Sequence, residues 1–336
     1  MKKIYFLCIT VILFSCELDK NPSPQVYSGN ALGTTFQIQF FHENELEIAK
    51  QIDSTFTVLN QSLSTYIPTS DISKINHGDS TIVVDQQFVT NFNTSKQIFE
   101  ITDGYFDPSV GILVNAYGFG PVKYNIQMND KNIDSLMTFV GFDKVIMDAN
   151  NHVIKKHPKT FLDFNSIAKG FAVDRLAALL DQLQVEDYLV EVGGELVASG
   201  KNLANNSSWR VGIDKPSSNE TDQRELLQFI VQLENRAMAT SGNYRKFKTD
   251  SLGNKFVHTI NPKTGKSEAS DILSATVFTK NCMTADAYAT AFMAMGFDKT
   301  IDLIPKLEDI DVILIHAKGQ EVETYISDNL ADFIID

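Results

Sequence analysis

One stretch of the sequence decides how the rest of the chain is interpreted: Asp163-Phe164-Asn165-Ser166-Ile167-Ala168-Lys169-Gly170-Phe171-Ala172-Val173-Asp174. An apolar run over 161–164 ends in polar residues, and helix-compatible residues follow as far as Leu180, so the pattern predicts a strand, a turn and a helix. Asn165 or Ser166 can cap that helix, and Asp163 and Lys169 place opposite charges beside its free N–H groups. Such a junction suits a phosphate with a metal ion, and it is equally compatible with a capped helix that only meets solvent.

The first residues are typical of an export signal. Lys2 and Lys3 precede an apolar run, Ile4 to Phe14, that is too short to cross a bilayer comfortably. The run ends in Leu-Phe-Ser-Cys16, which resembles the lipobox of bacterial lipoproteins, although a coincidental cysteine near an ordinary signal peptide is the alternative. We therefore predict a signal peptide over residues 1–15, lipidation at Cys16, a tether over residues 16–28 and one domain over residues 29–336. The protein is expected in the bacterial cell envelope, anchored by lipid to a membrane and facing the periplasm or the exterior.

Cysteine content and charge narrow the possible partners. Of Cys8, Cys16 and Cys282, the first would leave with the signal and the second would be acylated, so no internal disulfide is expected. The formal charge of −13 becomes −15 without Lys2 and Lys3, because the signal contains no acidic residue. This acidity disfavours nucleic acid and anionic lipid, so membrane attachment should come from acyl chains. An anionic ligand would need a cation and a local helix dipole at its site.

The remaining patterns predict an α+β fold, because strands cluster in groups without strict alternation with helices. Apolar residues at helical spacing predict four helices, over residues 43–63, 88–102, 132–140 and 283–296. Alternating or short apolar runs predict strands over residues 34–41, 144–147, 152–155, 161–164, 188–192, 195–199, 209–213, 228–233, 256–260 and 273–279.

The helix over residues 283–296 carries an acidic group in an otherwise apolar sequence. Thr284 can cap this helix, and Asp286 and Thr290 are four residues apart, so their oxygens lie on one face. A carboxylate and a hydroxyl so placed form part of an oxygen site for Mg²⁺. The alternative is that Asp286 only stabilises the N-terminus of the helix.

Two further segments carry candidate ligand contacts. Aromatic residues are interspersed with glycines and a proline between Tyr105 and Pro121, where a binding surface and a core-covering loop are both possible. His258 is the one histidine in an alternating strand that ends at an Asn-Pro turn, although most single histidines are structural or face solvent.

Taken together, these segments resemble the ApbE-type FAD:protein FMN transferases. The matching pieces span most of the expected mature chain and run in order as residues 33–36, 64–66, 104–111, 117–120, 163–174, 192–195, 239–245, 258–265 and 285–290. The resemblance implies an α+β, T-fold-like domain with mixed sheets, packed helices and a central flavin cleft. It also implies a Mg²⁺-dependent enzyme that binds FAD as a substrate, joins FMN through a phosphoester to a threonine hydroxyl of another protein, and releases AMP.

The resemblance also implies site residues by position. Those expected to touch FAD are Leu32, Tyr66, Tyr105, Phe106, Asp107, Asp163, Lys169 and Ile260. Those expected to hold the metal are Ser166, Asp286 and Thr290. Two departures from the family pattern are Leu32, where a methionine is common, and Ser166, where a smaller residue usually offers only its carbonyl.

The chemistry of phosphoryl transfer assigns roles to two of these side chains, Lys169 and Asp163, and to His258. Lys169 and the helix N-terminus would offset phosphate charge, His258 would accept the proton of the acceptor hydroxyl, and Asp163 is the competing base. The family's acceptor motif, Ser/Thr-Gly-Ala-Thr, does not occur in the sequence, so we expect a separate exported or membrane protein as the acceptor. Two alternatives remain open, an FAD pyrophosphatase that produces FMN and AMP and a flavin-binding lipoprotein without turnover.

Overall fold

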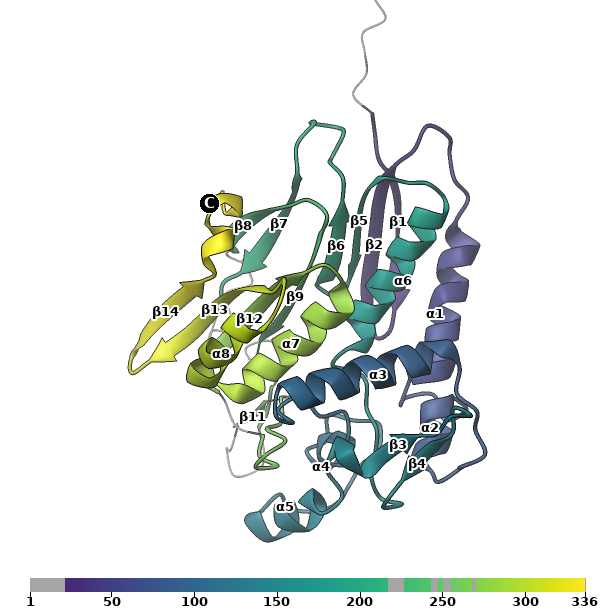
Figure 1. Cartoon of the computed structure of the whole chain (residues 1–336), viewed down its shortest axis with the longest axis vertical. Coiled ribbons are helices and arrows are strands. Elements are labelled where there is room, and N and C mark those ends of the chain that lie inside the picture. The colour runs from purple at the N-terminus through teal and green to yellow at the C-terminus, as the bar shows by residue number, and fades with distance from the viewer. Residues whose placement is uncertain are drawn as a thin grey trace, which may run out of the picture.

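An antiparallel sheet of eight strands forms the centre of the molecule (Figure 1). The computed structural model describes residues 22–216, 227–242, 247–249, 255–257, 259–267 and 270–335. In spatial order the strands are β1 (Gln25–Ala31), β2 (Thr34–Phe41), β5 (Asp187–Val192), β6 (Glu195–Ser199), β9 (Arg236–Gly242), β12 (Ile272–Thr279), β13 (Asp311–Lys318) and β14 (Glu321–Ile326). Every neighbouring pair is antiparallel.

The two faces of this sheet are buried by different layers. Along β2, Phe36, Ile38 and Phe40 point into the main core, and Phe41 belongs to a second core on the opposite face. Helices cover the main core: α1 (Ala49–Leu63), α3 (Gln86–Ile101), α6 (Ala168–Gln182), α7 (Cys282–Met295) and α8 (Phe297–Leu303). The hairpin of β7 (Trp209–Asp214) and β8 (Leu227–Leu233) covers the second core.

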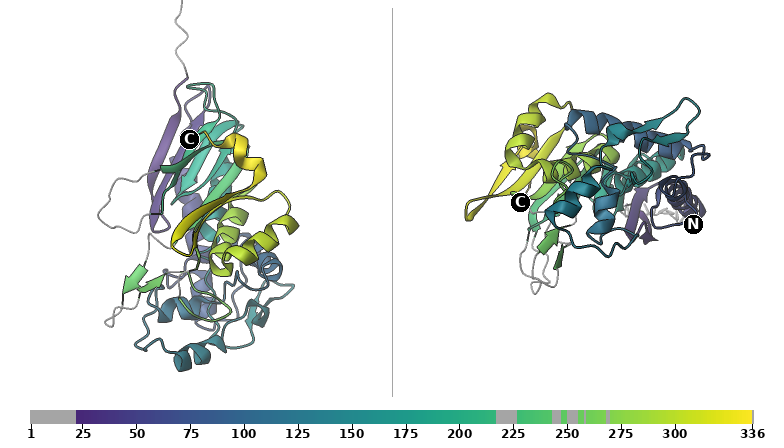
Figure 2. Two further views of the ribbon diagram at one scale, coloured as in Figure 1. Left: turned by 90° about the vertical axis from the view of Figure 1, so that its left-hand side faces the viewer. Right: turned by 90° about the horizontal axis from the view of Figure 1, so that it is seen from below.

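A smaller lobe lies at one end of the sheet, below α6 and α7 in Figure 1 and at the bottom of the left view in Figure 2. Its elements are α2 (Asp71–Asn76), α4 (Gly111–Ala116), α5 (Asp130–Met137), β3 (Val145–Met147) and β4 (Val153–Lys155). Outside it, β10 (Phe247–Thr249) and β11 (Lys255–Val257) pair with each other. Short 3₁₀ turns occur at Phe142–Lys144, Ile304–Lys306 and Asp328–Phe333. None of the helices in the described ranges has the length and apolar character needed to cross a membrane.

The α+β class is confirmed, whereas three local predictions are wrong. The tether cannot extend to residue 28, because β1 begins at Gln25 and pairs with β2. The first long helix begins at Ala49 rather than at residue 43. The side chains of Gln25 and Tyr27 hydrogen-bond the backbone of Leu46, which holds the preceding segment beside β1 instead of in a helical turn.

The predicted strand over residues 161–164 is also not a strand. Within the described residues, its only β-bridge joins Phe161 to Val110. The Asn76 side chain accepts from the Leu162 amide at 2.7 Å and donates to the Leu162 carbonyl at 2.8 Å, and the Asp163 amide donates to Pro108. The extended backbone is therefore satisfied without a neighbouring strand.

Candidate functional site

The first turns of α6 and α7 pack against each other and form the centre of the candidate site. Gly170 makes this approach possible, because a Cβ atom there would lie 2.3 Å from the Cys282 carbonyl oxygen and 2.9 Å from Asp286 Cβ. The Gly170 amide instead donates a 3.0 Å hydrogen bond to Asp286 Oδ2. Two segments separated by more than 100 residues thus meet at one helix end.

The structure changes the expected helix caps. Ile167 occupies the N-cap position of α6, and its side chain makes no capping hydrogen bond. Asn165 and Ser166 therefore do not cap this helix. The Asn165 amide donates to Asp163 Oδ1 at 2.8 Å, which turns the chain just before α6. In α7 the cap is Asn281 rather than Thr284, since Asn281 Oδ1 accepts from the Thr284 amide.

Asp174 adds a second contact between the two helices. This α6 carboxylate accepts from the amides of Cys282 at 2.7 Å and Met283 at 2.9 Å, at the start of α7. Burial raises the pKa of Asp174 to about 6, although the two amides act in the opposite direction. Each helix therefore supplies a carboxylate to the N-terminus of the other, which sequence patterns confined to one helix could not reveal.

Lys169 lies between two carboxylates at this junction. Its ammonium contacts Glu195 Oε1 directly and lies 3.9 Å from Asp286 Oδ1. Burial opposes the charged form of Lys169, but Asp286 and Glu195 together raise its pKa above the ordinary value. Glu195 was part of a segment that resembled the family, but no role was expected for it.

The three residues predicted to hold a metal ion occupy adjoining elements. Asp286 and Thr290 lie one helical turn apart on α7. Ser166 lies in the loop just before α6, and the Gly170 amide in the first turn of α6 donates to Asp286. Asp286 is only 3 % exposed, and Thr290 Oγ1 lies 3.4 Å from Ser241 Oγ on β9. Nowhere in the described ranges do three or more His, Cys, Asp or Glu side chains gather as a metal site. Carboxylate, hydroxyl and carbonyl oxygens nevertheless fit Mg²⁺, which prefers hard oxygen ligands.

Asp163 and Tyr66 lie near each other on the side of the lobe. Burial raises the pKa of Asp163. Burial, followed by the charge of Asp163, also raises the pKa of Tyr66. The Tyr66 hydroxyl donates to the Phe119 carbonyl at 3.2 Å, while the residue remains 57 % exposed. Tyr66 therefore presents an accessible aromatic surface beside a buried carboxyl group.

The three consecutive residues expected to touch FAD differ in accessibility. Phe106 is buried, and Asp107 accepts hydrogen bonds from Ser109 and from the Phe142 amide. Burial raises the pKa of Asp107 to about 6. Tyr105 is partly exposed, and the ammonium groups of Lys263 and Lys299 lie 5.6 Å and 5.5 Å from the centre of its ring. Tyr105 is thus the member of this trio whose side chain is best placed to meet a ligand.

The remaining predicted residues lie in three places. Leu32 forms the β1–β2 turn with Gly33, and both have positive φ. That turn is near the Gly193–Gly194 turn, because the Gly193 amide donates to the Thr35 carbonyl. Ile260 is buried in the core of the lobe with residues of α4 and α5. His258 and Cys16 lie outside the described residues.

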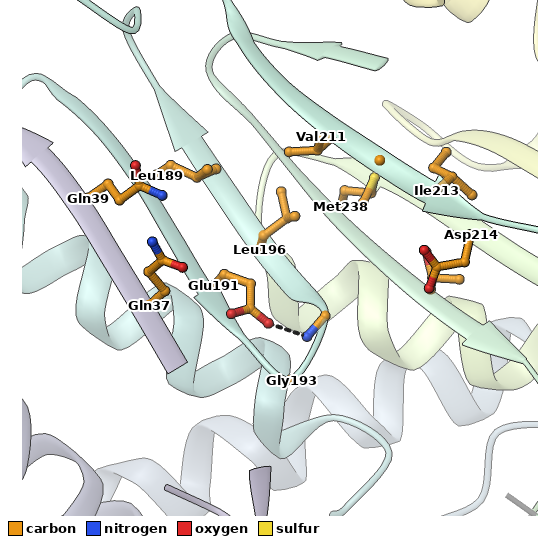
Figure 3. A pocket seen from close by; sticks show the side chains of 13 residues that line it. Gln37, Gln39, Leu189, Glu191, Gly193, Leu196, Val211, Ile213, Asp214 and Met238 are labelled. Carbon is orange, nitrogen blue, oxygen red and sulfur yellow. Dashed lines mark hydrogen bonds between the residues drawn. The ribbon is translucent and has the colours of Figure 1, made fainter. Parts of the chain in front are cut away.

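A cavity of about 360 Å³ lies on the face of the sheet opposite the main core, between the sheet and β7 (Figure 3). None of the predicted site residues lines it, and its lining residues include Glu191 and Asp214 but no Lys or Arg. Glu191 accepts from the Gly194 amide at 2.6 Å. The cavity has carboxylates but no cation, whereas the α6–α7 junction has Lys169 and oxygen atoms that fit a metal ion, so the junction is the better phosphate site.

Known proteins resemble this chain in both sequence and fold. The sequence model described as the ApbE family matches residues 32–314. An FAD:protein FMN transferase of Vibrio cholerae is 32 % identical over 98 % of this chain and 97 % of its own, and one of Haemophilus influenzae is 30 % identical over 91 % of each. The solved structure of the flavin transferase ApbE from Vibrio cholerae has a TM-score of 0.82 at 30 % identity, covering 93 % of this chain and 99 % of its own.

Proposed function

Because the chain belongs to the ApbE family, we propose that it is an FAD:protein FMN transferase. In this reaction a threonine hydroxyl of an acceptor protein attacks the phosphorus on the FMN side of the FAD pyrophosphate. The bond to the AMP phosphate breaks, AMP leaves with the bridging oxygen, and a protein base receives the hydroxyl proton. The products are AMP and a protein carrying FMN through a phosphoester.

The observation that carries this proposal is the buried contact of Lys169 and the Gly170 amide with Asp286. Phosphoryl transfer needs positive charge and hydrogen-bond donors around the phosphates far more than it needs covalent help from the protein. The N-terminal end of α6 supplies its dipole, and Lys169 supplies a full charge. Glu195 and Asp286 offset the charge of Lys169, so a bound metal ion would have to supply the net positive charge for an anionic substrate in this chain of formal charge −13.

Asp286, Thr290 and Ser166 would hold Mg²⁺, whose charge stabilises the negative oxygens of the pyrophosphate. Tyr66 and Tyr105 provide aromatic surface for the planar parts of FAD. Asp163 lies near Tyr66, and burial raises its pKa, which makes its carboxylate a better proton acceptor than an exposed aspartate. His258 is the other candidate base.

The choice between these bases can be made by mutation. His258→Ala should retain FAD binding, measured by flavin fluorescence. Whichever of His258→Ala and Asp163→Asn lacks the base should transfer FMN about 10² to 10⁴ times more slowly at saturating FAD. An unchanged transfer rate rules out the substituted residue as the base.

The reaction itself is tested by incubating the full chain with FAD, Mg²⁺ and a protein bearing a Ser/Thr-Gly-Ala-Thr segment. We expect the acceptor to gain the mass of one FMN and an equal amount of AMP to appear. The matched control is the same acceptor with its final threonine replaced by alanine, which should gain no mass. AMP without the mass gain would indicate an FAD pyrophosphatase, and neither product would indicate a flavin-binding protein without turnover.

We also propose that the chain is attached to a membrane by acyl chains at Cys16 and acts on an exported or membrane acceptor protein in the cell envelope. The support is the apolar segment before Cys16 and the absence of the acceptor motif from the chain itself. Cys16→Ser should block lipid attachment and release the protein into the soluble envelope fraction. Unchanged processing and membrane attachment of that variant would refute the anchor.

A further inference from the structure

We propose that Glu195 is a positioning residue that holds the Lys169 ammonium away from Asp286, so that the Asp286 carboxylate remains available to a divalent cation. This inference rests on the proposed function, in which Asp286 is a metal ligand. It assigns a role to a residue that neither binds the metal nor touches the reacting atoms.

The first observation is how Lys169 is shared between two acids. Its ammonium is in direct contact with Glu195 Oε1, whereas its 3.9 Å separation from Asp286 Oδ1 is too long for a direct hydrogen bond. Asp286 Oδ2 is already occupied by the Gly170 amide. Oδ1 is therefore the oxygen that a cation could use, and Lys169 is close enough to compete for it.

The second observation is how firmly Glu195 is placed. It begins β6 directly after the Gly193–Gly194 turn and is paired with Val192 on β5, so its backbone is fixed by the large sheet. The residue is 4 % exposed, and its second oxygen, Oε2, is buried without a hydrogen-bond partner. Burial raises the pKa of Glu195, and the charge of Lys169 opposes this shift. A carboxylate with so little solvation attracts a nearby ammonium strongly, because water competes little for either charge.

The consequence follows from the flexibility of lysine. Its ammonium sits on a four-carbon stem and can move between acceptors at little cost. Without the Glu195 charge, Asp286 is the carboxylate within 4 Å of that ammonium, and an ion pair between them would occupy the oxygen that the cation needs. Glu195 thus raises metal affinity by drawing away a competitor.

The experiment measures Mn²⁺ binding to the full chain by electron paramagnetic resonance of the free ion, in detergent and without FAD, so that the readout is independent of turnover. Glu195→Gln keeps the size of the side chain and removes its charge. We expect its Kd for Mn²⁺ to rise about 10-fold or more, within the range for residues that act on a metal through its ligands. Melting temperatures of all variants check that each is folded.

The matched control is Glu191→Gln, on the neighbouring strand of the same hairpin. Glu191 feels the Lys169 charge but bonds the Gly194 amide instead of the ammonium. This variant reports the general effect of removing one negative charge, and its Kd should rise less than about 3-fold, as expected for a partly exposed charge. An equal rise in both variants would overturn the role of Glu195.

A double-mutant cycle isolates the competition itself. In a Lys169→Met background no ammonium remains to be held, so adding Glu195→Gln should change the Kd less than about 3-fold, the same general charge effect. A 10-fold rise there as well would show that Glu195 acts without Lys169 and would overturn the proposal.

Asp286→Asn separates this inference from the proposed function. If that variant binds Mn²⁺ as tightly as the unmodified chain, the metal assignment is wrong and the role of Glu195 is lost with it. If Asp286→Asn binds poorly while Glu195→Gln binds normally, the metal site stands and only the positioning role is overturned.

Discussion

The N-terminal ends of α6 and α7 lie against each other, yet their carboxylates are used differently. At the α7 end, Asp174 uses both oxygens on backbone amides, and Asn281 caps the helix as well. At the α6 end, Asp286 gives one oxygen to the Gly170 amide and directs the other toward Lys169. Both oxygens of Asp174 accept from backbone amides, whereas Asp286 has one buried oxygen that accepts from no amide in the described ranges.

The hydrogen bonds alone thus distinguish a carboxylate that stabilises the fold from one that is available to a ligand. A carboxylate whose acceptors are all occupied by amides stabilises a fold and has little left for a ligand. A carboxylate that is buried, half occupied and close to a cation is costly for the fold and is typical of a site. Four substitutions test this distinction, and they follow in order of expected effect.

Asp286→Asn should have the largest effect. It preserves an acceptor for the Gly170 amide but removes the charge at the proposed cation site, so FMN transfer should fall by about 10³ or more while the protein stays folded. The measurement is the rate of acceptor flavinylation at saturating Mg²⁺. Asp174→Asn makes the same chemical change at the other helix end and should keep most activity; equal losses in the two variants would end the distinction.

Gly170→Ala should destabilise both helix ends together. The added methyl group would overlap the Cys282 carbonyl, so we expect the free energy of unfolding to fall by about 3 kcal/mol or more, in the upper range for overpacking. Elsewhere in a helix the same exchange is favourable by about 0.5 to 1 kcal/mol, so the sign alone is diagnostic. Chemical denaturation measures the change, and a stabilised variant would show that the helices do not approach this closely.

Asp174→Asn should change how stability depends on pH. The pKa of Asp174 is raised from 3.8 to about 6 in the folded chain, so between these values the folded state binds a proton that the unfolded state lacks. Stability contributed by Asp174 is therefore present below pH 4 and is lost as the pH rises to about 6. Between pH 4 and pH 7, the free energy of unfolding of the variant should therefore fall by about 2 kcal/mol less than that of the unmodified chain. Denaturant unfolding at pH 4, 5, 6 and 7 measures this difference.

The matched control for this titration is Asp53→Asn on the exposed side of α1. A decline of the same size in Asp174→Asn and in the unmodified chain would show that Asp174 is not the titrating group.

Asn281→Ala should have the smallest effect. Loss of this cap costs about 1 kcal/mol of stability, because the Thr284 amide loses its side-chain acceptor while Asp174 still serves its two neighbours. Flavinylation should be unchanged at 25 °C, and thermal unfolding should shift downward. A marked loss of activity in a folded variant would mean that the α7 end also belongs to the site.

Local patterns were sufficient for the elements whose signals lie within one segment. The spacing of Asp286 and Thr290 placed both on one face of α7, and alternation located β2 and β8. The patterns did not predict β9 or β13. They also predicted a strand at Leu162, whose backbone groups bond the Asn76 side chain instead of a neighbouring strand. The roles of Asp174 and Glu195 were missed for the same reason, since each acts on an element distant in the sequence.

The start of β1 at Gln25 also sets how far the proposed lipid anchor can reach. Eight residues lie between Cys16 and Gln25, so the nine steps from one to the other span at most about 32 Å even when fully extended. β1 adds about 23 Å for its seven residues before the Leu32–Gly33 turn, which lies beside the Gly193–Gly194 turn that leads into Glu195. The proposed anchor and the α6–α7 junction would therefore lie at opposite ends of one edge strand. If the chain is anchored as proposed, a membrane-bound acceptor would have to present its modified residue within this reach of the bilayer, which would favour acceptors whose modified segment projects from the membrane surface.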